Sequence, residues 1–276
     1  MQYRKDRYGN PISALGFGCM RFPTIEKDGK KVIDRPQAIA MLRHAIDSGV
    51  TYVDTAYPYH DGEGETVVGL ALQDGYRDRV TLTTKLPLWL LETKADMQRF
   101  LDEQLTKLKT DHVDFYLLHA MDKEALEKMR KLDYPEFLEK AVKAGKVRYP
   151  GFSFHDDYKT FVEILNDYDW KLAQVQMNVL DGDNQATLQG IEEVGKRNVG
   201  VVIMEPLRGG ALAPPPKEAA ALYEAFPEKR SAVEWAFRYL YDMPEVVTIL
   251  SGMSTMEQLD DNLRIFAHAE KTCMND

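Results

Sequence analysis

The sequence has little cysteine, no long apolar run and no dense basic tract, and each absence argues against a class of protein. Only Cys19 and Cys273 occur among 276 residues, so there is no CxxC pair and no disulfide framework. No segment reaches the roughly eighteen apolar residues of a membrane span, and the N-terminus lacks a signal-peptide core. The net charge of −9 without a Lys/Arg-rich tract argues against nucleic-acid or anionic-membrane partners. We therefore expect a soluble, cytoplasmic protein.

Apolar residues, in contrast, are plentiful enough for one large core, at 44% of the chain. There is no short-period repeat and no shift in composition that would mark a domain boundary. The one low-complexity tract is APPPK at 213–217, which is typical of a stiff loop. We expect residues 1–276 to form a single domain.

Short β-branched or aliphatic runs alternate with amphipathic segments along the chain. The strand candidates are 12–18, 51–57, 80–86, 113–119, 147–153, 172–178, 200–206 and 246–252. The helix candidates are 35–49, 93–110, 134–146, 156–167, 184–198, 229–241 and 255–269. Apolar strands separated by helices of ~10–15 residues indicate a parallel sheet covered by helices, and this number of units favours a (β/α)₈ TIM barrel.

Three details refine this expectation. Residues 1–15 are expected to form a short hairpin, with its turn near Asn10, that caps the bottom of the barrel. Thr93 is a candidate N-cap and Gly49 a candidate C-cap of the flanking helices. Pro150 falls inside the fifth strand, where its missing N–H requires either a bulge or pairing that starts later.

Polar residues follow three neighbouring strand candidates at their carboxyl ends, where active-site groups of such barrels lie. Asp54 lies in the second strand with Tyr59 beyond it, Lys85 near the end of the third, and His119 at the end of the fourth. Singly, each has a structural explanation: a helix cap, packing, a solvated lysine or a satisfied core histidine. Their coincidence on consecutive strands favours a functional site.

Proton donation to a carbonyl during hydride addition fits these four residue types. A phenol with a pKa near ~10 is a weak acid at neutral pH, and a neighbouring ammonium lowers the cost of its ionisation. Asp54 would hold Lys85 charged, Tyr59 would donate the proton, and His119 would orient the carbonyl and stabilise its developing charge.

The motifs around these residues resemble the aldo-keto reductase superfamily over essentially the whole chain. They are DTAYPY with GEGETVVGLAL, the lysine of TTKL, the histidine of LLH, GKVRYPGFSFH, QVQMN, MEPLRGGAL and SGMSTMEQLDDNL. The resemblance implies a catalytic tetrad of Asp54, Tyr59, Lys85 and His119. His60 and the DGEGE spacing depart from the usual glycine after the tyrosine. The spacing is closest to members that carry a C-terminal ferredoxin-like module, but the tail of this chain, with Cys273 alone, cannot bind a four-cysteine cluster.

The resemblance also implies a nicotinamide cofactor extended across the barrel mouth, and no metal. The residues implied in cofactor binding are Asp54, Gly18, Cys19 and Met20 beside the nicotinamide, Ser153 and Gln176 at its carboxamide, Pro206, Leu207, Arg208 and Gly210 at the pyrophosphate, and Gly252, Met253, Ser254, Gln258 and Asn262 around the adenosine. Cys19 is expected to be a small wall residue and not a nucleophile, and Cys273 an incidental thiol of the tail.

We accordingly predict an NAD(P)H-dependent enzyme that reduces small aldehydes or ketones to alcohols. NADP(H) is favoured over NAD(H) because most members of the superfamily use it, although residues 251–263 contain no Lys or Arg for a 2′-phosphate. Two alternatives remain open: a Schiff-base aldolase that uses Lys85, and a regulatory subunit that binds the cofactor and senses redox state.

Overall fold

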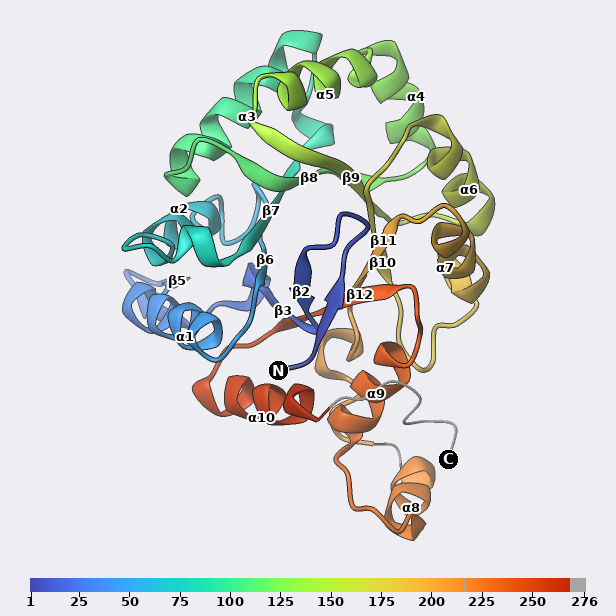
Figure 1. The fold of residues 1–276 in the computed structure, drawn as a ribbon. Coiled ribbons are helices and arrows are strands. Elements are labelled where there is room, and N and C mark those ends of the chain that lie inside the picture. Colours follow the sequence, from blue (N-terminus) through green and yellow to red (C-terminus); the bar gives the residue numbers. More distant parts are fainter. Residues whose placement is uncertain (216, 269–276) are drawn as a thin grey trace.

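The computed structural model describes residues 1–215 and 217–268, and its centre is a closed barrel of parallel strands ringed by helices (Figure 1). Around the barrel the strands follow the order β10-β11-β12-β3-β6-β7-β8-β9. Their bounds are β3 Leu15–Gly18, β6 Tyr52–Asp54, β7 Thr81–Leu86, β8 Val113–Met121, β9 Val147–Phe154, β10 Leu172–Gln176, β11 Gly200–Met204 and β12 Val246–Gly252. The (β/α)₈ barrel predicted from the sequence is therefore confirmed.

Most barrel strands differ from the expected ranges by one to three residues at their ends, and three of them show features that the ranges did not include. The range 12–18 is divided at Ala14 into β2 (Pro11–Ser13), outside the barrel, and β3 within it. The range 51–57 ends as a strand at Asp54, so the following residues form a turn. Pro150 lies in β9, whose pairing with β10 starts one residue later, at Gly151 and Leu172. The missing N–H therefore falls before that ladder begins, which is one of the two arrangements expected.

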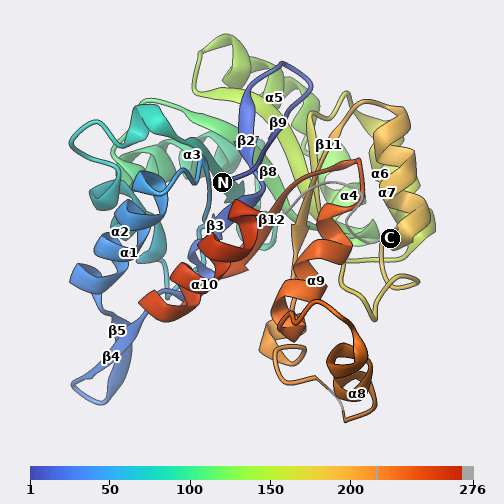
Figure 2. The same cartoon turned by 60° about the horizontal axis from the view of Figure 1, so that its bottom comes forward.

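The helices surround the barrel and cover its outer face (Figures 1 and 2). Their bounds are α1 Arg35–Asp47, α2 Gly64–Ala71, α3 Lys94–Leu108, α4 Lys123–Lys131, α5 Tyr134–Lys143, α6 Tyr158–Asp167, α7 Thr187–Lys196, α8 Lys217–Ala225, α9 Ala232–Tyr241 and α10 Met256–Ala267. The apolar positions that follow helical spacing are buried, namely Ala38, Leu42 and Ile46 in α1 and Met97, Leu101, Leu105 and Leu108 in α3. Thr93 caps α3 in a capping box with Asp96, as expected, and Gly49 has a φ of 99° just after α1.

Three helices and one β-hairpin lie outside the predicted set. Helices α2 and α4 and the hairpin of β4 (Thr24–Lys27) and β5 (Lys30–Ile33) were not predicted, and α8 lies in a connection expected to be a loop. The hairpin turns at Asp28 and Gly29, with φ of 52° and 73°, a dipeptide suited to such a turn. Figure 2 shows that this hairpin and α8 project beyond the barrel.

The N-terminal hairpin closes one end of the barrel, as predicted. Strand β1 (Tyr3–Lys5) pairs with β2. Ile12 is buried with the inward-facing side chains Tyr52, Phe115 and Leu172, which lie near the amino ends of their strands. The guanidinium of Arg4 donates to the backbone oxygens of Tyr241, Met243 and Val246, so the hairpin is tied to the last part of the barrel.

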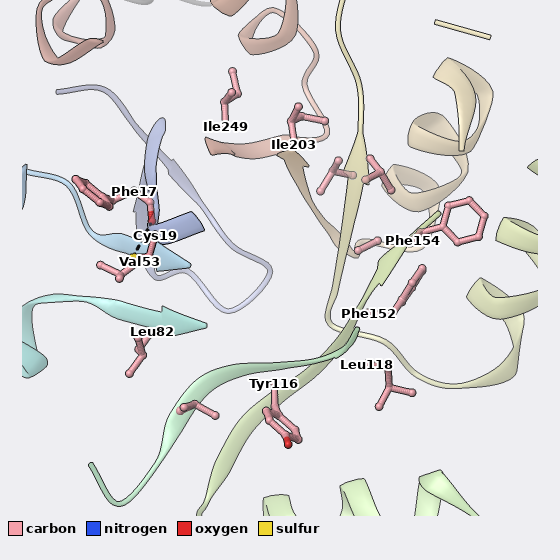
Figure 3. Close-up of a cluster of buried hydrophobic side chains, with 14 of the residues drawn as sticks. Phe17, Cys19, Val53, Leu82, Tyr116, Leu118, Phe152, Phe154, Ile203 and Ile249 are labelled. Atoms are coloured by element: carbon pink, nitrogen blue, oxygen red, sulfur yellow. Dashed lines mark hydrogen bonds between the residues drawn. The ribbon is translucent and has the colours of Figure 1, made fainter. Parts of the chain in front are cut away.

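Side chains that point outward from the barrel fill the layer between strands and helices. Figure 3 shows this layer, with Phe17, Leu82, Phe152 and Ile203 from different strands, all fully buried. Cys19 lies in the same layer and its thiol contacts the backbone oxygen of Phe17 at 3.9 Å. Burial raises the pKa of this thiol well above its usual value, in agreement with a wall residue. Cys273 lies outside the described residues.

Among residues 1–215 and 217–268, no helix combines the length and the apolar character needed to cross a bilayer.

Candidate active site

The four polar residues singled out in the sequence meet at the carboxyl ends of adjacent barrel strands. Asp54 ends β6, Lys85 is the penultimate residue of β7, and His119 lies near the end of β8. Tyr59 lies in the turn that leads from β6 to α2. Because β6, β7 and β8 are neighbours in parallel, their ends open onto one mouth.

Lys85 is the centre of this group. Its Nζ donates to Asp54 Oδ1 at 2.8 Å and to the backbone oxygen of Thr55 at 2.8 Å, and both charged side chains are almost completely buried. Burial by itself would lower the pKa of Lys85, but Asp54 and Tyr59 outweigh it and raise the pKa above its usual value. The lysine is therefore an ammonium at neutral pH, held in one position by its partners.

Tyr59 receives the third hydrogen bond of that ammonium. Lys85 Nζ donates to the phenolic oxygen of Tyr59 at 3.3 Å and lies 5.0 Å from the centroid of its ring. Burial raises the pKa of Tyr59, whereas the charge of Lys85 opposes the rise. The phenol is thus protonated at neutral pH, and the charge of Lys85 favours its ionised form.

His119 of β8 completes the group, on the far side of β7 from β6. Its ring lies edge-on to Tyr59, with 6.3 Å between ring centroids. Burial, together with the charges of Lys85 and His155, lowers the pKa of His119 to about 3, so the imidazole is neutral at physiological pH. Its Nδ1 is buried and has no hydrogen-bond partner among the described residues. This favours the tautomer with the proton on Nε2, because an unpaired buried N–H would be costly.

Two neighbours of this group were not identified from the sequence. The backbone oxygen of Thr55 is a ligand of the ammonium, and no side-chain pattern could indicate it. Trp89 follows β7 in a short helix, Leu88–Leu90, is 52% exposed and lies 5.2 Å from His119 between ring centroids. An exposed tryptophan four residues after the lysine is a recognisable signal of an apolar wall beside the mouth.

The residues expected at a carboxamide already have partners from the chain itself. Ser153 Oγ accepts from the backbone N–H of Ala120 at 2.7 Å. Gln176 Nε2 donates to Asp181 Oδ2 at 2.7 Å, and Gln176 Oε1 accepts from Asn184 at 3.1 Å. Both ends of the Gln176 amide are therefore engaged by the segment that follows β10.

The glycine-containing loop after β11 is open and strongly curved. Gly209 and Gly210 have φ of 68° and 98°, in the region that favours glycine. Pro206 is buried and Leu207 partly buried, whereas Arg208 is exposed and lies 3.7 Å from Asp181. The N–H groups of Arg208 and Gly210 donate to carbonyl oxygens within the loop, and both glycines are exposed.

The residues expected around an adenosine divide into two groups. Gly252, Ser254 and Gln258 are exposed, and Gln258 Oε1 accepts from the backbone N–H of Ser254 at 2.8 Å. Met253 is buried in the hydrophobic core. Asn262 is also buried, and it donates to Ser251 Oγ at 2.9 Å.

Arg21 lies between these two loops and was not singled out from the sequence. Cβ, Cγ and Cδ of Arg21 cover Gly252, where an added Cβ would lie 3.1 to 3.2 Å from them. One guanidinium nitrogen lies 3.4 Å from the corresponding position at Gly209. The backbone oxygen of Arg21 accepts from Ser254 Oγ at 2.9 Å. Arg21 has no carboxylate partner within the part of the chain that the structure describes.

The segment before Arg21 forms the side of the mouth next to Tyr59. Gly18 lies close to the backbone of Ser251, because an added Cβ would lie 3.2 Å from the backbone oxygen of Ser251, and Met20 is 62% exposed. His60 Nε2 lies 3.2 Å from the backbone oxygen of Cys19, so the histidine after the tyrosine fastens this segment to the turn.

Comparison with known proteins identifies the family of the chain. Residues 14–273 match the family model described as the aldo/keto reductase family. The chain is 27% identical to the uncharacterized oxidoreductase YqkF of Bacillus subtilis (strain 168), over 92% of this chain and 87% of that protein. It superimposes on the apo form of aldo-keto reductase AKR11C1 from Bacillus halodurans with a TM-score of 0.78 and 26% identity, covering 100% of this chain and 93% of that one.

A further solved structure, an aldo-keto reductase from Klebsiella pneumoniae in complex with NADPH, gives a TM-score of 0.77 at 25% identity and covers 99% of this chain and 92% of that one. The barrel fold and the match along nearly the whole chain lead to the same family. The chain therefore belongs to the aldo/keto reductase family and is an NAD(P)H-dependent oxidoreductase that acts on carbonyl groups.

Proposed function

We propose that this enzyme reduces aldehydes or ketones to alcohols, with Tyr59 as the proton donor. The observation that carries the proposal is the position of Lys85 Nζ, which contacts Asp54, the backbone of Thr55 and the phenol of Tyr59 at once. A buried ammonium in this position has one acidic neighbour that can release a proton into the mouth. That neighbour is Tyr59.

Asp54 and Lys85 act as a unit in this mechanism. Asp54 keeps Lys85 charged despite its burial, and Lys85 stabilises the phenolate of Tyr59 as the proton leaves. Asp54 Oδ2 is buried without a hydrogen-bond partner among the described residues, so its charge is directed almost entirely to the lysine. The energetic cost of proton donation by the phenol is thereby lowered.

Neutral His119 is suited to orient the substrate. In this proposal its Nε2–H donates to a carbonyl oxygen bound between the imidazole and the phenol, and stabilises the charge that develops there. The pKa of about 3 means that His119 cannot act as the acid itself at physiological pH. The proton therefore comes from Tyr59.

The bound nicotinamide cofactor supplies the hydride in this chemistry. The chain offers a fitting cradle, because Gly209 and Gly210 after β11 are exposed and carry no side chain that would hinder a diphosphate, and Arg21 stands beside them. Ser153 uses its oxygen to accept from Ala120, which leaves the hydroxyl hydrogen available for a carboxamide. Gln176 would first have to exchange its partner Asp181 or Asn184 for the cofactor.

We propose NADP(H) as the preferred cofactor over NAD(H). The Klebsiella pneumoniae relative binds NADPH, and a 2′-phosphate requires a nearby cation. Arg264, the first basic residue after 251–263, does not meet this need, because it pairs with Asp261 at 2.8 Å and lies 3.6 Å from Glu234. Arg21, which lies against Gly252 and Ser254, supplies the positive charge that the segment itself lacks.

The structure disfavours a Schiff-base aldolase. Such an enzyme needs a neutral amine as its nucleophile, but Asp54 and Tyr59 raise the pKa of Lys85 and hold it protonated. Borohydride added together with a carbonyl compound should therefore leave Lys85 unmodified. Mass spectrometry of the treated protein checks this.

Replacement of Tyr59 by phenylalanine tests the proposal. The variant should lose about 10²–10⁴ in the rate of carbonyl reduction, followed by the absorbance of the reduced nicotinamide across a panel of aldehydes and ketones. Affinity for the cofactor should stay within a few-fold, because the phenol is assigned to the substrate and not to the cofactor. A variant that retains full activity would remove Tyr59 as donor. A wild-type protein that binds cofactor but turns over no carbonyl would instead favour a regulatory role.

A further inference from the structure

A fully buried polar network lies directly behind the proposed catalytic lysine. It joins Glu65 of α2, Thr84 of β7 and Gln104 of α3, all 0% exposed. Glu65 Oε1 accepts from Thr84 Oγ1 at 2.6 Å and from Gln104 Nε2 at 2.7 Å. Gln104 Nε2 also donates to the backbone oxygen of Lys85 at 2.9 Å. The network therefore holds the strand at Lys85 and its neighbour from outside the barrel.

The same network is coupled to Tyr59 through the start of α2. A Cβ added to Gly64 would lie 3.0 Å from the backbone oxygen of Tyr59 and 3.1 Å from the Cβ of Tyr59. Tyr59 therefore packs tightly against Gly64, which directly precedes Glu65. At the other end of α2, a Cβ on Gly69 would lie only 2.4 Å from the backbone oxygen of Lys107. The two glycines allow α2 to lie close to both the Tyr59 turn and α3, which brings Glu65 within reach of Gln104.

The orientation of the Gln104 amide is also fixed. Tyr116 of β8 donates its hydroxyl to Gln104 Oε1 at 2.7 Å, which leaves Nε2 as the end that faces Glu65 and Lys85. Burial raises the pKa of Glu65, and Thr84 and Gln104 oppose this rise by donating to its carboxyl group. Burial of a carboxyl group costs free energy, and no residue of α2 is assigned to the reaction. We therefore interpret Glu65 as a residue that holds its neighbours in position.

We propose that Glu65 and Gln104 are positioning residues that set the separation between the phenolic oxygen of Tyr59 and Nζ of Lys85. The inference rests on the proposed function, in which that 3.3 Å contact lowers the cost of proton donation. Glu65 fixes the segment that carries Tyr59, Gln104 fixes the strand that carries Lys85, and the bond between them couples the two. Without it, the phenol and the ammonium are free to move apart, and the stabilisation of the phenolate falls with distance.

The test compares Glu65→Leu with Glu65→Gln. Both donors reach Glu65 through Oε1 alone, so a glutamine whose carbonyl oxygen takes this position keeps both bonds, whereas leucine keeps neither. We expect Glu65→Leu to lower kcat by about tenfold to a hundredfold, because displacements of ~1 Å at a reacting centre have effects of this size. Glu65→Gln should stay within about threefold of wild type by the same reasoning. Cofactor Kd should be unchanged in both.

A second readout separates positioning from simple destabilisation. The groups that face Tyr59 are Lys85, Asp54, Cys19 and His119, and all of them are unaltered in these variants. The pKa of the Tyr59 phenol, followed by NMR of protein labelled with ¹³C at tyrosine Cζ and assigned with Tyr59→Phe, should rise in Glu65→Leu and stay in place in Glu65→Gln. This measurement needs no turnover, so it tests the network even if carbonyl reduction is not the activity.

If Glu65→Leu does not fold, Tyr116→Phe replaces it, since this change removes only the hydroxyl that orients Gln104. It should give the same changes in kcat and phenol pKa at smaller size. Unchanged kcat and phenol pKa in the folded Leu or Phe variant would overturn the inference. So would an equal loss in Glu65→Gln, because charge and not positioning would then be the cause.

Discussion

Substitution of either Lys85 or Asp54 should lower the stability of the protein, and the size of the loss should depend on which of the two charges remains buried without its partner. In Lys85→Met the carboxylate of Asp54 loses the one partner of Oδ1, while Oδ2 already has none among the described residues. Removal of one partner of a buried ion pair lowers the free energy of unfolding by about 3–5 kcal/mol. Because no other group replaces Lys85 as a partner of Asp54, we expect Lys85→Met to lie at the upper end of this range. In Asp54→Asn the ammonium keeps the backbone oxygen of Thr55 and the phenol of Tyr59, so the cost should be nearer the lower end.

The double variant, which combines Lys85→Met with Asp54→Asn, has no buried charge at this position. Its loss of stability should be smaller than the sum of the two single losses, with a coupling of about 2 kcal/mol or more. Activity should follow the same pattern, because the two residues act as a unit and either single change already removes most of the turnover. The assay is urea unfolding for the four proteins together with steady-state kinetics.

The pH dependence of Lys85→Met provides the sharpest check. Burial raises the pKa of Asp54 and Lys85 opposes that rise, so without the lysine the folded-state pKa lies well above the unfolded value. A raised folded-state pKa gives stability that is present below the unfolded pKa and lost as pH rises through the folded one. The urea midpoint of Lys85→Met should therefore fall between about pH 5 and pH 8, while the double variant shows no such fall. The idea that Asp54 and Lys85 act as a unit would be refuted by two results together. These are equal urea midpoints of Lys85→Met at both pH values, and a loss of stability in the double variant equal to the sum of the two single losses.

The other predictions concern the remaining polar groups of the mouth. Because the pKa of His119 is about 3, no ionisation near neutral pH should come from it, and the pH profile of kcat should be unaltered there in His119→Gln. Carbonyl reduction by wild type should decline only at high pH, as Tyr59 loses its proton, since burial raises the pKa of that phenol. Arg21→Ala should weaken NADPH about tenfold and NADH less, measured by quenching of tryptophan fluorescence at low salt, and Arg21→Lys should recover part of the loss. Equal weakening of both cofactors would assign Arg21 to the diphosphate that they share and remove its support for NADP(H).

The barrel could be predicted from the sequence because parallel strands buried on both faces are nearly continuous apolar runs. Within such runs Asp54 and Lys85 stood out, since a charged residue in a buried strand requires a partner. The spacing of strands and helices then placed both at the same end of the barrel. The hairpin of β4 and β5 was missed although Asp28 and Gly29 form a favourable turn, because its strands are mostly exposed and polar.

Contacts between distant side chains could not be predicted in the same way. Arg21 covers Gly252 only because the segments that follow β3 and β12 meet at the mouth, and Asp181 reaches Gln176 only through the conformation of the loop that follows β10. Nothing in the local pattern of either residue distinguishes it from a solvated charge. Gln104 likewise occupies a position on α3 that could equally be exposed, and its burial depends on the close approach that Gly69 allows.

The barrel closes through its first and last strands, β3 and β12, which pair Leu15 with Ile249, while Arg4 binds backbone oxygens as far along as Val246. During synthesis these contacts cannot form until almost the entire chain has left the ribosome. Until then β3 and β11 each present an unpaired edge, which is open to association with other chains. Closure over such a sequence separation is slow, because the loop entropy is lost before the contacts form. A growing chain of this enzyme is therefore expected to depend on chaperones up to the emergence of β12.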